Sequence, residues 1–433
     1  MSFFEEVERE VRDFRQGGVA TSGFRLSLAE SVVSELGVER NRIGSAYAPL
    51  SVKELAGGSF TIGWSDGRMS SGSLSRGPKD ALRDVLLSAF EGRYDDPEDA
   101  IFPAPAAVPE VVLFSPEAAA AARGQAPDIL PGILSALAGV RERCAARIMD
   151  ASAQAAVVRR RVVTSGGFRA ESESTAVSFG FALDSLVGDG FSRRGLFAPG
   201  DVEKLASLTA ADFEALRHTA AGAPRGRTPV VLHPRVAEQF LRTFLLANLS
   251  GGAVANGRSR FVAADFRDRR RCFREDFSLR TSPLSPLSPG SFRFTEEGVP
   301  AREVLLVEKG CVLTPLLGLK HGRKLGMEPV PSPSAIEGFV FGLASRAGRE
   351  ESLSGSRTLL VHSVLGMHTQ DHVRGEYSLL CPQGVLYEEG RPLGRVTGTL
   401  NGSFFEDLRS EALCAVEFPG FACPGLALTA ELS

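Results

Sequence analysis

The stretch from Leu359 to Leu408 constrains the fold of this chain more than any other part of the sequence. It consists of short apolar runs separated by glycine-containing turns, at Gly375, Gly384, Gly390 and Gly398. Apolar runs bounded in this way are typical of consecutive strands in an antiparallel sheet. The sequence therefore predicts a β-rich C-terminal domain around which the rest of the chain is organised.

The preceding part of the chain mixes helical and strand patterns. Ser2 and Glu5 form a capping-box pattern ahead of a helix. A strand pattern from Phe60 to Trp64 enters a tight hairpin at Asp66-Gly67, and Pro78 opens a second helix. Helices and antiparallel strands together predict the α+β fold class.

Two changes in composition divide the chain. Prolines 103, 105 and 109 mark one linker, and residues 220–228 form another boundary. Between them, helical patterns flank strands that turn at Ser165-Gly166-Gly167. We predict an N-terminal α/β segment over residues 1–100, a middle helix-plus-strand segment over 101–222, and a C-terminal β-rich domain with an antiparallel sheet over 223–433.

The bulk properties argue against several classes of function. The net charge of −3 gives no electrostatic footprint for nucleic acid or an anionic membrane. The arginines between Arg258 and Arg274 alternate with acids, which is typical of a solvated loop. The N-terminus is acidic and unlike a signal peptide, and the six cysteines lie far apart, which favours reduced thiols. We expect a cytoplasmic protein that binds neither nucleic acid nor membrane.

Several glycine-containing turns recur in a fixed order near the C-terminus. They are Glu296-Glu297-Gly298-Val299-Pro300, Gly375-Glu376-Tyr377-Ser378, Gly384-Val385-Leu386-Tyr387 and Gly398-Thr399-Leu400-Asn401-Gly402. This succession resembles the TldD/TldE (PmbA) family, a metalloprotease pair also called modulators of DNA gyrase, and is closer to the TldE/PmbA subunit. Thr295 stands where the family has an acid, so this chain lacks that carboxylate.

The resemblance has a consequence for metal binding. TldD-like chains carry His-Glu-x-x-x-His on the helix after a Val-Val-Leu strand, where two imidazoles can bind zinc and the carboxylate can act as base. Here that helix reads AEQFLRTFLLANLSGG, with Glu238 as its only acid and with Phe244 and Leu245 where polar ligands would be needed. We expect no catalytic residue and no metal ligand in this chain.

The resemblance therefore implies a TldE/PmbA-like subunit of a cytoplasmic heteromeric zinc metalloprotease. The family acts on unfolded or small peptides, including leader-peptide trimming, and zinc is expected in a TldD-like partner. The predicted partners are a TldD-like paralogue in a heterodimer, or a second copy in a homodimer, and a peptide substrate. The helix from Pro234 and the C-terminal sheet are predicted to mediate association.

Seven residues are candidates for lining a substrate channel: Glu296, Glu297, Gly298, His368, His372, Glu376 and Tyr377. The two glutamates precede a glycine turn and could face a channel and orient a peptide amine, but a solvated turn whose acids accept backbone N–H bonds is the more common explanation. His368 and His372 have metal-like spacing, but Gly366 and Gly375 disfavour the helix that this spacing needs. His362 is predicted to be a core histidine and His233 to cap a helix.

Two alternative functions remain open. One is a non-catalytic homodimeric binding or scaffold protein. The other is an independent metal hydrolase that uses His368 and His372.

The repeated Ser-Pro steps from Ser282 to Ser291 predict an extended loop that is mobile or shields a cavity entrance.

Overall fold

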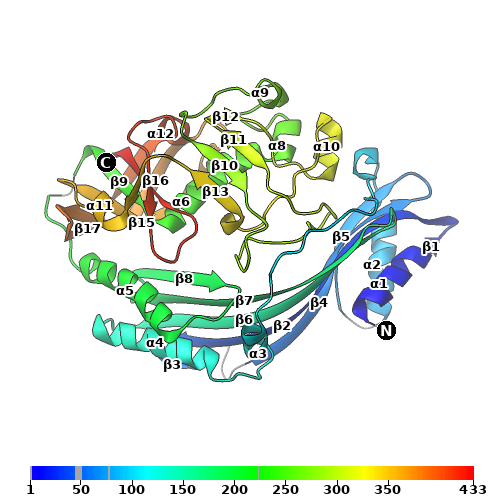
Figure 1. Cartoon of the computed structure of the whole chain (residues 1–433), viewed down its shortest axis with the longest axis horizontal. Coiled ribbons are helices and arrows are strands. Elements are labelled where there is room, and N and C mark those ends of the chain that lie inside the picture. The colour runs from blue at the N-terminus through cyan, green and yellow to red at the C-terminus, as the bar shows by residue number, and fades with distance from the viewer. Residues whose placement is uncertain (1, 44–50, 77–78, 223) are drawn as a thin grey trace.

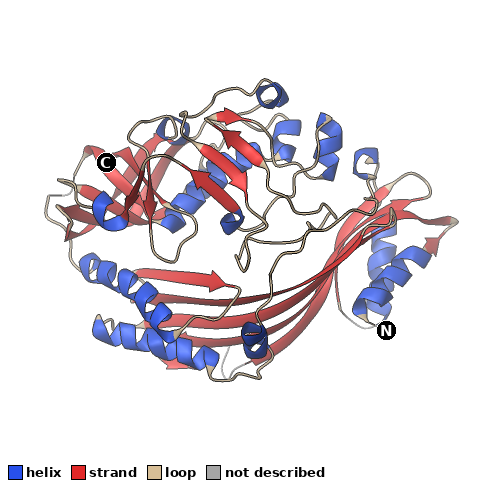
Figure 2. Ribbon diagram, viewed as in Figure 1, coloured by secondary structure: helices blue, strands red, loops and turns tan. Residues whose placement is uncertain are grey.

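The computed structural model describes residues 2–43, 51–76, 79–222 and 224–433. We call residues 2–222 the N-terminal half and residues 224–433 the C-terminal half. A long curved sheet dominates the first, and a compact strand-rich body in the second lies over the concave face of that sheet (Figures 1 and 2). Helices and mostly antiparallel strands confirm the predicted α+β class.

The long sheet has the strand order β5-β4-β2-β6-β7-β8, and two short strands, β1 and β3, pair with β2. Strand β2 pairs with β4 on one side and β6 on the other over most of its length. The long sheet contains strands from both sides of residue 100. The predicted boundary at that position stays a prediction. The strands are β1 (Arg15–Gln16), β2 (Val19–Glu39), β3 (Arg42–Ile43), β4 (Ser51–Trp64), β5 (Met69–Ser75), β6 (Met149–Thr164), β7 (Arg169–Leu183) and β8 (Val187–Arg193).

Two groups of helices cover the other face of this sheet at its opposite ends (Figure 1). At one end, α1 (Phe3–Asp13) and α2 (Lys79–Glu91) pack around Trp64, and Ser2 and Glu5 form the predicted capping box. Pro78, where we placed the start of the second helix, lies outside the described residues. At the other end are α3 (Pro116–Ala122) and α4 (Ile129–Arg143), and α5 (Pro199–Leu216) packs against α4.

The C-terminal half contains a closed ring of strands. Strand β9 pairs with β15 in parallel and with β19 in antiparallel orientation, which closes the order β9-β15-β16-β17-β19 on itself. The antiparallel succession predicted within residues 359–408 is confirmed by β15, β16 and β17. The strands are β9 (Gly226–Leu232), β14 (Arg346–Gly348), β15 (Thr358–Leu365), β16 (Glu376–Glu388), β17 (Arg391–Ser403), β18 (Cys414–Glu417) and β19 (Gly425–Leu432).

One helix lies against this ring and is continuous through three conformations. It begins as α6 (Pro234–Phe240), widens into the π-helical turn η2 (Leu241–Leu246) and ends as α7 (Ala247–Leu249). Val236, Phe240, Phe244 and Leu245 are fully buried in the core of the C-terminal half. The apolar face on which we based the predicted association is therefore already packed within the chain, and association through this helix stays a prediction.

The remaining elements surround the ring. A small sheet has the order β12-β11-β10-β13. No helix in the described ranges is long and apolar enough to span a membrane. These elements are β10 (Ser278–Thr281), β11 (Leu305–Glu308), β12 (Cys311–Val312), β13 (Phe339–Gly342), α8 (Gly251–Ala255), α9 (Ala263–Arg267), α10 (Leu319–Leu325), α11 (Arg349–Ser352), α12 (Phe404–Asp407), and the 3₁₀ turns η1 (Pro97–Asp99), η3 (Ile336–Gly338) and η4 (Met367–Thr369).

One of the hydrophobic clusters contains residues from both halves. Phe179 of β7 and Leu216 of α5 belong to the same buried cluster as Val231 of β9, Leu360 of β15 and Val385 of β16. Burial of apolar surface across this junction holds the ring on the long sheet. The candidate site described next lies at the edge of this junction.

Candidate functional site

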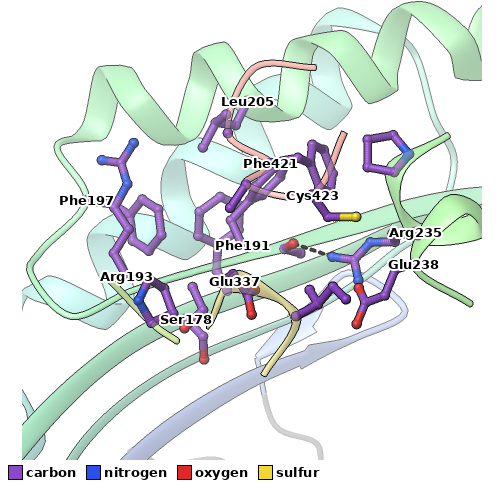
Figure 3. Close-up of a pocket in the computed structure, with 18 of the residues that line it drawn as sticks. Ser178, Phe191, Arg193, Phe197, Leu205, Arg235, Glu238, Glu337, Phe421 and Cys423 are labelled. Atoms are coloured by element: carbon purple, nitrogen blue, oxygen red, sulfur yellow. Dashed lines mark hydrogen bonds between the residues drawn. The ribbon is translucent and has the colours of Figure 1, made fainter. Parts of the chain in front are cut away.

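A cavity of about 610 Å³ lies where β7, β8 and α5 of the N-terminal half face α6, η3 and the loop 418–424 of the C-terminal half (Figure 3). Ligand-binding cavities have this size and often lie between structural units. Aromatic, aliphatic and charged side chains all contribute to its wall. The wall includes Phe191, Arg193, Arg235, Glu238, Arg242, Pro289, Ile336, Glu337, Phe421 and Cys423.

Each arginine in this wall is paired with a carboxylate. Arg193 lies 2.6 Å from Asp201, Arg235 lies 2.6 Å from Asp189, and Arg242 lies 2.7 Å from Glu238 one helical turn away. The cavity therefore does not present these arginines as uncompensated cations.

Glu337 is different from the other charged groups of the wall. It is partly buried at the centre of η3, and it forms no ion pair with any residue in the described part of the chain. Figure 3 draws Glu337 among the side chains that line the cavity. A carboxylate without a counter-ion in a partly enclosed site attracts cations.

Cys423 lies in the same cavity but is not an activated nucleophile. Burial, together with the nearby carboxylates of Glu238 and Glu337, raises the pKa of its thiol to about 12. A nucleophilic cysteine requires the opposite environment, in which nearby cations lower the pKa. Cysteine-protease chemistry at this position is therefore disfavoured.

A buried network of charged and polar groups lies directly behind the cavity. Asp189 of β8 accepts hydrogen bonds from Arg235 and from Thr209 of α5, at 2.6 and 3.1 Å. Asp212 of α5 accepts hydrogen bonds from Arg349 and from Tyr387, at 2.5 and 2.7 Å. Both carboxylates belong to the N-terminal half and both arginines to the C-terminal half, so the network fixes one half against the other.

Two histidines occupy the centre of this network. His233 caps α6, as predicted, and its Nε2 lies 3.5 Å from Asp189. The side chain of His362 is buried, and its Nε2 lies 3.2 Å from Oδ2 of Asp212. The two rings have centroids 5.0 Å apart. Burial, together with the nearby His362, holds the pKa of His233 well below its ordinary value, so that this ring is neutral at pH 7.

The seven predicted channel residues lie elsewhere, and none of them lines this cavity. Glu296 forms an exposed ion pair with Arg160 at 2.9 Å, and Glu297 accepts a hydrogen bond from the backbone N–H of Leu319 at the start of α10. Gly298 has φ +84° and packs against Phe168. These contacts agree with a structural role for the turn, and the predicted role in a channel stays a prediction.

The four candidates near β16 are also separate from the cavity. His368 is exposed in η4, and the backbone carbonyl of His372 accepts a hydrogen bond from Asn248. Glu376 is exposed at the start of β16, whereas Tyr377 is buried and donates a hydrogen bond to Asp407 at 3.0 Å. The structure therefore distributes these residues between the surface and the core.

The Ser-Pro loop from Ser282 to Ser291 contributes to the cavity wall through Pro289. Arg194 is mostly buried, and its guanidinium donates hydrogen bonds to the carbonyl oxygens of Ser288, Pro289 and Ser291. Burial lowers the pKa of Arg194. Arg194 thus holds the loop from Ser282 to Ser291 in place, although the prolines of this loop prevent regular backbone hydrogen bonding.

Replacing Arg194 by alanine is expected to release this loop without unfolding the chain. Hydrogen bonds that involve a charged group make a net contribution of about 1.5–3 kcal/mol each, so cleavage between Ser282 and Ser291 should accelerate at least roughly tenfold. Limited chymotrypsin digestion with mass spectrometry measures this rate at the exposed Leu284 and Leu287. Arg147→Ala, at a highly exposed arginine, is the control. Equal rates in the two variants would contradict the anchoring role.

The cavity residues do not fit a zinc ion. Nowhere in the described ranges do three or more histidine, cysteine or acidic side chains form a group that could hold a metal. Glu238 is already paired with Arg242, so Glu337 is the one carboxylate of the wall without a counter-ion among the described residues, and a catalytic zinc site needs three protein ligands. We therefore derive no chemical step through a metal in this chain.

The sequence reasoning missed the residues that the cavity brings together. Glu238 was noted only as an isolated acid, and Glu337 and Arg242 were not noted at all. His233 and His362 were assigned separate structural roles, and their closeness was not foreseen. No local motif marks these residues, because they come from separate strands, turns and helices that meet only in the folded chain.

Comparisons with known proteins agree with this architecture. Residues 225–425 match the family described as PmbA/TldA metallopeptidase C-terminal domain. A search of curated proteins with this sequence found no match. Solved structures with the same fold exist, although their sequence identity to this chain is low.

One such structure is TldE from Thermococcus kodakarensis, with a TM-score of 0.76 and 18% identity over 95% of this chain and 96% of that chain. Another is a putative modulator of DNA gyrase from Thermotoga maritima, with a TM-score of 0.74 and 17% identity over 100% of both chains. A third is a putative modulator of DNA gyrase from Bacteroides thetaiotaomicron, with a TM-score of 0.73 and 15% identity over 99% and 96%. The C-terminal half of the chain therefore matches the PmbA/TldA metallopeptidase family, and the whole chain has the fold of these solved structures.

Proposed function

We propose that this chain is the TldE/PmbA-like, non-zinc subunit of a heteromeric zinc metallopeptidase that acts on unfolded or small peptides, including leader peptides. Zinc and the catalytic base belong to a TldD-like partner. This chain contributes one wall of the peptide-binding space, through the cavity between its two halves. The proposal rests on the helix from Pro234 to Leu249, whose side chains do not supply a zinc-binding motif.

The shape of this helix suits a metal site better than its side chains do. In His-Glu-x-x-x-His the histidines are five residues apart, and an α-helix separates such residues by about 140° around its axis. The i→i+5 hydrogen bonds of a π-turn bring them closer to one face. The π-turn η2 has this geometry, but the pair Arg242 and Ala247, five residues apart across it, supplies no metal ligand.

The side chains on this helix support a packing role instead. Arg242 faces the cavity and is paired with Glu238, while Phe244 and Leu245 are fully buried. The likeness to the chain described as TldE from Thermococcus kodakarensis is consistent with this assignment at the level of the fold. Within a two-subunit peptidase, such a chain shapes the binding space and leaves the chemistry to its partner.

The purified chain alone is expected to hold no stoichiometric zinc and to show no peptidase activity. Activity should appear when the chain is mixed with a TldD-like paralogue that carries His-Glu-x-x-x-His. Zinc analysis by mass spectrometry and hydrolysis of an unstructured peptide test the two statements. Because a catalytic zinc site needs three protein ligands, the exposed His368 and its neighbour His372 cannot form one alone.

Changing His368 and His372 together to alanine is the matched control, and the mixed activity should stay within a few-fold of the parent. Zinc near one equivalent per chain that disappears in this double variant would refute the proposal in favour of an independent metal hydrolase. A tight homodimer that does not bind the paralogue would instead favour a scaffold protein. Analytical ultracentrifugation of the single and mixed chains distinguishes the last case.

A further inference from the structure

The charge balance of the cavity between the two halves leaves one group unmatched. Arg193, Arg235 and Arg242 each contact a carboxylate within 2.7 Å, whereas Glu337 forms no ion pair among the described residues. The cavity with its paired groups therefore carries the negative charge of Glu337. A ligand that supplies a positive charge at this point is favoured over a neutral or an anionic one.

The backbone that carries Glu337 is rigid. The carbonyl oxygen of Gly338 accepts a hydrogen bond from Ser282 at 2.7 Å, and a side chain at Gly338 would lie 2.3 Å from Pro333. Gly290 packs against the same turn so closely that an added Cβ would lie 2.0 Å from the nitrogen of Gly338. The loop that contains Gly290 is itself held by Arg194. Glu337 is thus preorganised, which lowers the cost of binding.

The surroundings of Glu337 are aromatic and apolar. Phe191 and Phe421 lie with ring centroids 4.9 Å apart, and buried Ile336 precedes Glu337 in η3. Arg235 already lies over the ring of Phe421, at 5.8 Å from its centroid. Aromatic faces next to a carboxylate suit an ammonium or guanidinium group with an attached hydrocarbon chain.

We propose that this cavity binds a positively charged nitrogen of an extended peptide, with Glu337 as its counter-ion. The group is either the N-terminal ammonium or a basic side chain, since both present the same charge. The inference rests on the proposed function only in taking a peptide as the occupant. Glu238 is a second carboxylate of the wall, and its charge is masked by Arg242.

The test uses the purified full chain without any partner, so that it does not depend on peptidase activity. The probe is an unstructured octapeptide with one lysine and a fluorophore at its C-terminus, and fluorescence anisotropy measures its affinity. Four forms are compared: free or acetylated at the N-terminus, each with lysine or with glutamine in its place. The form that loses binding identifies the ammonium or the side chain as the bound group.

Glu337→Gln is expected to weaken binding of the preferred cationic form roughly tenfold and to leave the acetylated glutamine form unchanged. Arg242→Gln should have the opposite effect and strengthen that binding roughly threefold or more, because it unmasks Glu238. Glu411→Gln, at an exposed glutamate outside the cavity, is the control and should match the parent.

Equal affinity for all four peptide forms, no measurable binding of any of them, or unchanged affinity in Glu337→Gln would overturn the inference. Unchanged or weaker binding in Arg242→Gln would overturn the charge balance from which it is drawn. Failure of the mixed chains to hydrolyse peptide would refute the proposed function and leave a charge-dependent binding result standing. The two failures are therefore distinguishable.

Discussion

Replacing Asp212 by alanine is expected to lower the free energy of unfolding by about 3–5 kcal/mol. The carboxylate of Asp212 is almost fully buried, and the same oxygen accepts hydrogen bonds from Arg349 and from the hydroxyl of Tyr387. His362 lies on its second oxygen. Removing the carboxylate leaves the buried guanidinium of Arg349 without a counter-ion, and this desolvation cost is larger than the loss of the hydrogen bonds themselves.

Urea denaturation followed by circular dichroism measures this change. Asp268→Ala is the control, because Asp268 is exposed on a surface turn, and it should shift the free energy of unfolding by less than about 0.5 kcal/mol. A double variant, Asp212→Leu with Arg349→Met, removes both charges and should recover a substantial part of the loss. An Asp212→Ala chain as stable as the control variant would show that the network does not hold the two halves together.

The buried contacts of Asp212 join residues that are far apart in the chain. Contacts of this kind leave no local pattern, so the sequence predicted the fold better than the site. The capping box at Ser2 and Glu5 and the hairpin at Asp66-Gly67 follow from contacts between residues close in the chain. The strands between Leu359 and Leu408 follow from period-two burial and glycine turns. Such signals are local, so a sequence pattern is sufficient to predict them.

The site depends instead on contacts between residues far apart in the chain. His233 was correctly predicted to cap a helix, but its neighbour Asp189 lies on a strand of the other half. Glu337 lies in a three-residue turn with no recognisable motif, and its importance arises because neighbouring charges are neutralised by other residues. The pairing of charges across a tertiary interface leaves no periodic pattern in the sequence. For this reason the sequence analysis selected Glu296 and Glu297 as candidates and did not select Glu337.

Replacing Asp407 by asparagine is expected to stabilise the chain at pH 8 and to have a much smaller effect at pH 4. Asp407 lies at the end of α12 and accepts a hydrogen bond from buried Tyr377 at 3.0 Å. Burial raises the pKa of this carboxyl group from 3.8 to about 7. At pH 8 the folded chain must therefore hold a charge that its surroundings disfavour, and asparagine accepts the same hydrogen bond without that charge.

The direction of the pH effect follows from proton linkage. Between pH 3.8 and about 7 the folded chain retains the proton on Asp407 while the unfolded chain has lost it, so stability falls as the pH rises through this window. With allowance for partial exposure of the group, the parent should lose about 1–3 kcal/mol more than Asp407→Asn between pH 4 and pH 8. Comparing the two chains cancels the titration of His233 and the other groups that they share. Urea denaturation at five pH values measures the difference, with Asp268→Asn as the control. Parallel stability curves for the parent and Asp407→Asn would mean that the carboxyl group is already ionised and solvated in the folded chain, and would exclude Tyr377 and Asp407 as a closed, buried pair.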